Sequence, residues 1–108
     1  MAWEVIISSV AEKQLVAITD KRVQRGLIRA IDGLENDPLT RGKPLSGKLT
    51  GCFSIRAEAQ RYRIIYKIDR EAGRVFVLTM GLRKQGDRAD VYALAERLIR
   101  FGLFSRFE

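Results

Sequence analysis

The clearest alternation of apolar and polar positions in the chain runs through residues 60–69, QRYRIIYKID. Successive side chains of an extended strand point to opposite faces, so this pattern predicts a strand with two unlike sides. One side is apolar and needs a core, since it carries Tyr62, Ile64, Tyr66 and Ile68. The other side carries Arg61, Arg63, Ile65 and Lys67. That second side is either solvated or built to hold an anion.

A helical period of three to four residues precedes this strand. Ser9, followed by Glu12 three residues later, has the pattern of a capping box, which predicts the start of a first helix. Thr19 or Asp20 then caps a second helix. The apolar positions of the second helix recur at spacings of three and four and are Val23, Leu27, Ala30, Ile31 and Leu34. This helix ends before Pro38, so the two neighbouring helices are predicted to form a hairpin.

Four segments are typical of strands, namely residues 2–7, 52–59, 61–69 and 74–83. A tight turn, REAG, joins the last two. The segment 37–51 contains both prolines of the chain and has neither a helical nor a strand period, so it is expected to be a loop.

From Asp90 the chain turns helical again, with Val91, Leu94, Ala95 and Leu98 on one face. The resulting order, β-α-α-β-β-β-α, predicts an α+β fold in which the helical hairpin packs on one face of a mainly antiparallel four-stranded sheet. The 108 residues are expected to form one domain, 1–108, that needs no metal or disulfide to fold.

Composition adds a preference for an anionic partner. The chain has 20 Lys and Arg against 13 Asp and Glu, a formal net charge of +7, and 14 of the 20 cations are arginines. Guanidinium groups bind phosphate and carboxylate through paired hydrogen bonds, so a polyanion or an acidic protein is the expected partner. The single cysteine, Cys52, is expected to be a small core residue. No secretory signal or membrane span is visible, which predicts a cytoplasmic protein with no membrane partner.

The cations of the last three strands are predicted to converge. If residues 52–59 pair antiparallel with the next strand, Arg56 lies near Arg63 on the side opposite the core. In the last strand, one face is expected to carry Val75, Val77, Thr79, Gly81 and Arg83. Arg83 would then end the strand on a small-residue face, where Gly81 leaves room for a ligand. Together Arg56, Arg61, Arg63 and Arg83 are predicted to form one concave basic site with Tyr92 at its edge.

Each of these features also has a plainer interpretation. The arginines can instead pair with Glu58, Asp69, Asp87 and Asp90 on an ordinary sheet surface. The loop cations Arg41, Lys43 and Lys48 are either solvated or in contact with phosphate. The apolar tail residues Phe101, Leu103, Phe104 and Phe107 either pack on the core or dock a partner.

Nearly the whole chain resembles the RelE/ParE superfamily, the toxins of bacterial type II toxin–antitoxin pairs. The most specific segments are YRIIY, and the ending in which GLRK is followed by VY. The resemblance implies the fold of these toxins, a cognate antitoxin as partner, and one of two activities. Some members cleave messenger RNA in the ribosomal decoding site, whereas others inhibit DNA gyrase without nuclease chemistry.

The resemblance also implies roles for individual residues. The pattern of the RelE-type ribonucleases is matched at Arg56, Arg63, Arg83 and Tyr92, whereas Ser54 stands where the family often has a lysine. Arg63 and Arg83 are therefore expected to grip the scissile phosphate, and Tyr92 is expected to be the general base, aided by the nearby guanidinium groups. The substrate-binding residues are expected to be Ser54, Arg56, Arg61 and Lys48.

The leading hypothesis is a ribosome-dependent endoribonuclease that cleaves mRNA in the A site and inhibits translation. RNA carries its own nucleophile, the 2′-hydroxyl, so a protein without histidine can still orient it, take its proton and stabilise charge on the phosphorane. The resemblance implies 2′,3′-cyclic phosphate and 5′-hydroxyl products. No metal or cofactor is expected, because the sequence has no histidine and no paired carboxylates at ligand spacing.

Two other functions stay open. A non-enzymatic DNA gyrase inhibitor is favoured by Ser54 in place of the family's lysine. An inactivated binding module that only recruits an antitoxin follows if the arginines are salt-bridged. For either toxin, the antitoxin is expected to wrap the helical hairpin or to cover the basic face with acidic residues.

Overall fold

The computed structural model describes residues 2–58 and 61–100. Its helices and strands are, in chain order, β1 (Glu4–Ile7), α1 (Ser9–Ala17), α2 (Lys21–Asp32), α3 (Pro38–Arg41), β2 (Lys43–Pro44), β3 (Cys52–Ala57), β4 (Tyr62–Asp69), β5 (Arg74–Leu82) and α4 (Val91–Arg100). Two short 3-10 turns, η1 (Gly33–Glu35) and η2 (Gly47–Leu49), lie between them. The predicted order of the main elements is confirmed. The apolar tail, residues 101–108, lies outside the described residues, so its predicted packing or docking stays a prediction.

The five strands form one sheet in the order β1-β5-β4-β3-β2. Only β1 and β5 pair in parallel, and the other neighbours are antiparallel, which confirms a mainly antiparallel sheet. The fifth strand, β2, was not predicted, and the expectation of a plain loop over residues 37–51 is wrong because this segment also holds α3 and η2. A strand of two residues is too short to show a period, and Pro44 is tolerated there because β2 is an edge strand.

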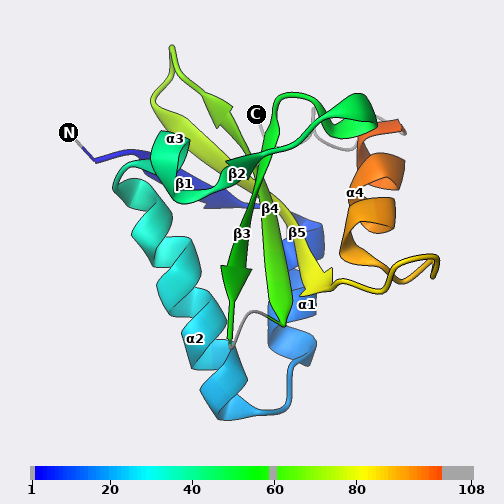
Figure 1. Ribbon diagram of the computed structural model, residues 1–108. Coiled ribbons are helices and arrows are strands. Elements are labelled where there is room, and N and C mark those ends of the chain that lie inside the picture. Colours follow the sequence, from blue (N-terminus) through cyan, green and yellow to red (C-terminus); the bar gives the residue numbers. More distant parts are fainter. Residues whose placement is uncertain (1, 59–60, 101–108) are drawn as a thin grey trace.

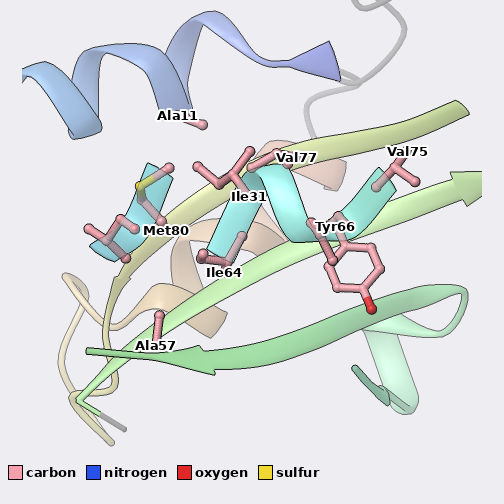
Figure 2. Packing of buried hydrophobic residues seen from close by; sticks show 10 residues of the cluster. Ala11, Ile31, Ala57, Ile64, Tyr66, Val75, Val77 and Met80 are labelled. Atoms are coloured by element: carbon pink, nitrogen blue, oxygen red, sulfur yellow. The ribbon is translucent and has the colours of Figure 1, made fainter. Parts of the chain in front are cut away.

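The helical hairpin α1–α2 lies on one side of the sheet and α4 on the other (Figure 1). We call the first side the hairpin face and the second the α4 face. The core on the hairpin face includes Ala11, Leu27, Ile31, Leu34, Ala57, Ile64, Tyr66, Val75, Val77 and Met80, from both helices, η1 and three strands (Figure 2). All five predicted apolar positions of the second helix belong to this core or pack against it, so its periodicity is confirmed.

A second, smaller core lies beneath α4. It consists of Leu49, Cys52, Ile65, Phe76, Leu78, Val91 and Ala95. Cys52 is buried there as predicted, and its burial raises the pKa of the thiol, so it behaves as a core residue rather than a reactive group. On the α4 face the apolar layer therefore covers only part of the sheet.

A bulge in β5 changes which residues share a face. Ile65 pairs with Thr79 and Tyr66 pairs with Val77, so Leu78 is the extra residue between them. Because of this bulge, the prediction that Val77 and Gly81 share a face is wrong. Val77 and Val75 lie in the core of the hairpin face, whereas Gly81 lies beside Val91 of α4. Beyond the bulge, Gly81 therefore lies on the α4 face rather than on the hairpin face.

The start of α1 is shifted by one residue from the predicted capping box. The N-cap is Ser8, whose Oγ accepts a hydrogen bond from the Ala11 amide at 2.9 Å and donates one to the Leu78 carbonyl at 2.7 Å. The bond to Leu78 is a tertiary contact that a local sequence pattern does not reveal. For α2, the cap is Asp20, one of the two predicted candidates. Within the described ranges, no helix combines the length and apolar character that crossing a membrane requires.

Candidate functional site

Three neighbouring strands bring two arginines and a glycine side by side on the α4 face. Arg56 of β3 pairs with Arg63 of β4, and Arg63 in turn pairs with Gly81 of β5. Directly opposed residues project to the same side of a sheet, so the predicted approach of Arg56 to Arg63 is confirmed. A Cβ at Gly81 would lie 3.7 Å from the Cβ of Val91, an ordinary packing distance, so the start of α4 lies beside this end of β5.

These strands and α4 enclose a groove of about 330 Å³, which we call the basic groove. It is lined by Lys43, Leu45, Ser54, Arg56, Arg63, Arg83 and Tyr92. Five predicted site residues, one on α4 and four on or just after the strands, are therefore brought together. A neighbouring hollow of about 400 Å³ shares Arg63 and Arg83 with the groove and adds Arg61, Leu82 and Lys84. Lys48, also predicted to bind substrate, is exposed in η2 and lines neither space.

The carboxylate of Asp90 fixes the start of α4 against the end of the sheet. Its Oδ2 accepts hydrogen bonds from the amides of Tyr92 and Ala93 at 3.0 and 3.1 Å, and its Oδ1 accepts one from the amide of Lys84. The Tyr92 hydroxyl lies 3.1 Å from Ser54 Oγ in a hydrogen bond. Asp90 thus holds the backbone of Tyr92, and Ser54 of β3 holds its hydroxyl at the groove.

Most of the acidic residues that were weighed as partners for the arginines are engaged elsewhere. The carboxylates of Asp69, Asp87 and Asp90 accept hydrogen bonds from backbone amides. Arg63 is only 9% exposed, and its Nη1 donates to the Tyr62 carbonyl at 3.4 Å. Arg83 takes part in no ion pair within residues 2–58 and 61–100. The plain interpretation of a salt-bridged sheet surface therefore does not describe Arg83.

Sequence reasoning did not single out Lys43 or Leu45 as groove residues. Lys43 was grouped with Arg41 and Lys48 as a loop cation of undecided role. The register of β2 on β3 sets it apart, because it pairs Lys43 with Ser54. The helix-start signal at Asp90 was visible in the sequence, but its bond to the Lys84 amide depends on the tertiary fold.

The groove combines fixed positive charge with two groups that can transfer protons. Arginine side chains remain protonated, so Arg56, Arg63 and Arg83 suit phosphate binding rather than acid–base chemistry. Tyrosine and lysine can exchange a proton with a substrate. In the part of the chain that the structure describes, histidine, cysteine and carboxylate side chains do not gather in the groups of three or more that hold a metal ion. The arginines and the lysine of the groove therefore suit an anionic ligand.

Comparison with known proteins agrees with this geometry. A family model described as the ParE toxin of the type II toxin–antitoxin system, parDE, matches residues 5–86. Toxin RelG of Mycobacterium tuberculosis is 32% identical over 92 residues, which covers 85% of this chain and 98% of that relative.

Solved structures show the same fold. A chain of the toxin–antitoxin complex RelBE2 from Mycobacterium tuberculosis is 31% identical, with a TM-score of 0.69, and the match covers 77% of this chain and 100% of that one. A mutant of the E. coli toxin RelE in the free state is 21% identical, with a TM-score of 0.70 over 93% of this chain and 98% of that one. As its sequence motifs predicted, the chain belongs to the RelE/ParE superfamily, the toxins of type II toxin–antitoxin systems.

Proposed function

We propose that this toxin is an endoribonuclease that cleaves messenger RNA in the ribosomal A site and so inhibits translation. The observation that carries the proposal is the meeting of Arg56, Arg63, Arg83 and Tyr92 in the basic groove. These are the four positions at which the sequence matches the pattern of the RelE-type ribonucleases. A gyrase inhibitor has no need for a tyrosine hydroxyl held among phosphate-binding groups.

In the proposed reaction, the 2′-hydroxyl of the message attacks the adjacent phosphorus. Tyr92, as phenolate, accepts the proton of that hydroxyl, and a hydrogen bond from Ser54 Oγ at 3.1 Å would hold the phenolate in place. Arg63 and Arg83 stabilise the charge that develops on the phosphorane, and Arg56 holds the RNA backbone. The products are a 2′,3′-cyclic phosphate and a 5′-hydroxyl, and no metal is needed.

The ribosome has a role in this scheme that the groove alone does not fill. The groove supplies cations for the phosphate and groups that can exchange protons, whereas free single-stranded RNA is flexible and must still be aligned. Alignment of a nucleophile with a phosphate accounts for a large share of such a rate enhancement. A message already held in the A site is delivered in a defined conformation, which favours cleavage there over cleavage of free RNA.

A second candidate function, inhibition of DNA gyrase, is supported by the match to the ParE toxin model. In that case the arginines of the groove would meet carboxylates of a protein partner, which guanidinium groups also bind through paired hydrogen bonds. Ser54 in place of a lysine is compatible with this alternative. The two functions differ in whether messages are cut.

We also propose a cognate antitoxin as the physiological partner. RelE-type toxins of Mycobacterium tuberculosis, E. coli and Pyrococcus horikoshii have been solved in complexes with their antitoxins. A chain with a formal charge of +7 suits an antitoxin segment rich in acidic residues. Such a segment would inhibit by covering Arg56, Arg63 or Arg83, or by wrapping the helical hairpin.

The test is to express the toxin from a tightly controlled promoter and to map new 5′ ends across cellular messages, with Arg83→Ala in parallel. New 5′-hydroxyl ends at fixed codon positions of translated frames, absent with Arg83→Ala, would support the ribonuclease. Growth arrest with intact messages and an induced DNA-damage response would instead support gyrase as the target.

A further inference from the structure

We infer that Lys43 is a catalytic residue of the basic groove, the general acid that protonates the departing 5′-oxygen of the RNA. This inference rests on the proposed ribonuclease function. It concerns a residue of the short edge strand β2, which pairs with β3 so that Lys43 lies opposite Ser54. Opposed side chains share a face, and Lys43 accordingly lines the groove together with Arg63, Arg83 and Tyr92.

The backbone at Lys43 is held from both sides, although its side chain is exposed. Gly42 lies so close to the hydroxyl of the fully buried Tyr66 that a Cβ at this position would collide with it. After Lys43, the ring of Pro44 fixes φ, and the amide of Leu45 donates to a β3 carbonyl at 2.9 Å. The Cα of Lys43 is therefore fixed relative to β3, while the ammonium group can turn toward a bound phosphodiester.

Expulsion of a 5′-oxygen creates an alkoxide, which needs a proton. The guanidinium groups of Arg56, Arg63 and Arg83 stay protonated and cannot supply one. Tyr92 is already assigned to the 2′-hydroxyl, and the Ser54 hydroxyl is too weak an acid. Among the residues that line the basic groove, Lys43 is the one ammonium group. It therefore fills a chemical role for which the groove has no other candidate.

The placement of the two proton-transferring groups also fits the reaction. Lys43 enters the groove from β2 and Tyr92 enters it from α4. Both are neighbours of Ser54, because Lys43 pairs with Ser54 in the sheet and the Tyr92 hydroxyl lies 3.1 Å from Ser54 Oγ. In a displacement at phosphorus the entering and leaving oxygens lie roughly in line on opposite sides. An acid and a base that enter the groove from different elements can serve the two oxygens separately.

The step balances as follows. A bond forms between the 2′-oxygen and phosphorus while the bond between phosphorus and the 5′-oxygen breaks. The proton of the 2′-hydroxyl passes to the Tyr92 phenolate, and a proton of Lys43 Nζ passes to the 5′-oxygen. The neutral amine of Lys43 then regains a proton from water, and Tyr92 returns its proton to water.

The test measures single-turnover cleavage of mRNA on programmed ribosomes by four forms of the toxin: wild type, Lys43→Arg, Lys43→Met and Lys13→Met. Arginine keeps the positive charge but cannot act as an acid. Both Lys43 variants should therefore cleave more slowly by about 10²-fold or more, the usual contribution of general acid catalysis. Lys13→Met is the control, because Lys13 is an exposed lysine of α1, on the other side of the sheet, that lines neither hollow; it should cleave as wild type does.

A second substrate makes the test specific to the leaving group. In an mRNA whose scissile 5′-oxygen is replaced by sulfur, the departing thiolate needs no proton. Lys43→Arg should cleave this substrate at the wild-type rate, whereas Arg83→Ala should remain slow on both substrates. If Lys43→Arg cleaves ordinary mRNA within about tenfold of the wild-type rate, Lys43 is not the acid. The same conclusion follows if Lys43→Arg stays slow on the sulfur-substituted mRNA. A wild-type toxin that cuts neither substrate would instead overturn the proposed ribonuclease function.

Discussion

The two faces of the central sheet use the same strands for different purposes. On the hairpin face, Ile64, Tyr66, Val75 and Val77 are fully buried beneath α1 and α2. On the α4 face, β4 passes from the fully buried Ile65 to the cationic Arg63 within two residues. One face is thus filled by apolar side chains along its length, whereas the other is filled only where α4 covers it. The difference indicates that stability is concentrated on the hairpin face, whereas the proposed chemistry lies on the α4 face.

The part of the α4 face that α4 does not cover lowers the stability of the fold. Arg56 and Arg63 are directly opposed, and like charges at such positions destabilise a sheet unless an anion lies between them. Arg63 is also nearly buried, which removes water from a charged group. The core of the hairpin face supplies stability that offsets part of this cost. A substitution should therefore affect either folding or cleavage according to the face on which it lies.

The largest effect is expected for Arg83→Ala. Loss of a guanidinium group from the transition state should lower cleavage by about 10³-fold or more. The free energy of unfolding should change by less than about 0.5 kcal/mol, since Arg83 is exposed. Single-turnover cleavage and urea denaturation measure the two quantities. Arg88→Ala, another exposed arginine a few residues away that lines neither hollow, is the matched control and should change neither. A fully active Arg83→Ala would remove this residue from the site.

The second largest effect on cleavage is expected for Tyr92→Phe. The ring and its packing are kept, and only the hydroxyl that is 3.1 Å from Ser54 Oγ is lost. Cleavage should fall by at least about 10²-fold if the hydroxyl is the general base. Ser54→Ala is the control, because it removes the partner of this hydrogen bond but leaves the base, and it should cost less than about tenfold. If Tyr92→Phe also stays within tenfold of wild type, the base lies elsewhere.

On the hairpin face, Leu27→Ala should lower stability and leave cleavage unchanged. Leu27 is fully buried in α2, so its truncation leaves a cavity and should lower the free energy of unfolding by about 2–5 kcal/mol. The neighbouring Ile28 is 39% exposed, and Ile28→Ala should cost much less. Cleavage per folded molecule should be unchanged in both variants. A Leu27 variant whose folded fraction has lost activity would show that the two faces are not separable.

The sequence predicted the hairpin face better than the α4 face for a physical reason. The core positions of α2 repeat with the helical period over several turns, so burial leaves a long, regular signal, from Val23 to Leu34. Alternation in β4 is equally clear, because Tyr62, Ile64, Tyr66 and Ile68 all belong to the core of the hairpin face or pack against it. In β5, the single extra residue Leu78 reverses the faces beyond it, and no local pattern announces such a bulge.

The candidate site was predictable only in part. Arg56, Arg63, Arg83 and Tyr92 were found because strand alternation and a family resemblance pointed to the same residues. Of the two lysines in the polar, proline-containing segment, the sequence analysis chose Lys48 as a substrate-binding residue and not Lys43, although Lys43 is the one that lines the groove. What distinguishes them is the pairing of β2 with β3, a long-range contact of two residues that leaves no periodic trace.

Tyr66 provides the smallest and last test, because its hydroxyl links the core of the hairpin face to the Pro38 carbonyl of α3. Burial raises the pKa of its hydroxyl to about 12, while a hydrogen bond from the Gly42 backbone and the charge of Arg41 act in the opposite direction. The unfolded chain loses this proton near pH 10, whereas the native protein holds it up to about pH 12. Stability from this group is therefore complete below pH 10 and is lost as the pH rises from about 10 to about 12, a total of about 2–3 kcal/mol.

Urea denaturation between pH 8 and 11.5 should show this loss in the wild type and a shallower one in Tyr66→Phe. The variant should be less stable at pH 8 by about 1 kcal/mol, because it lacks the 2.7 Å hydrogen bond to the Pro38 carbonyl. Cys52 has a raised pKa as well, and its contribution cancels because both proteins contain it. Equal slopes would mean that Tyr66 does not control alkaline unfolding. Ionisation also removes the proton that Tyr66 donates to the Pro38 carbonyl, so the hydrogen bond that joins β4 to α3 is lost with it.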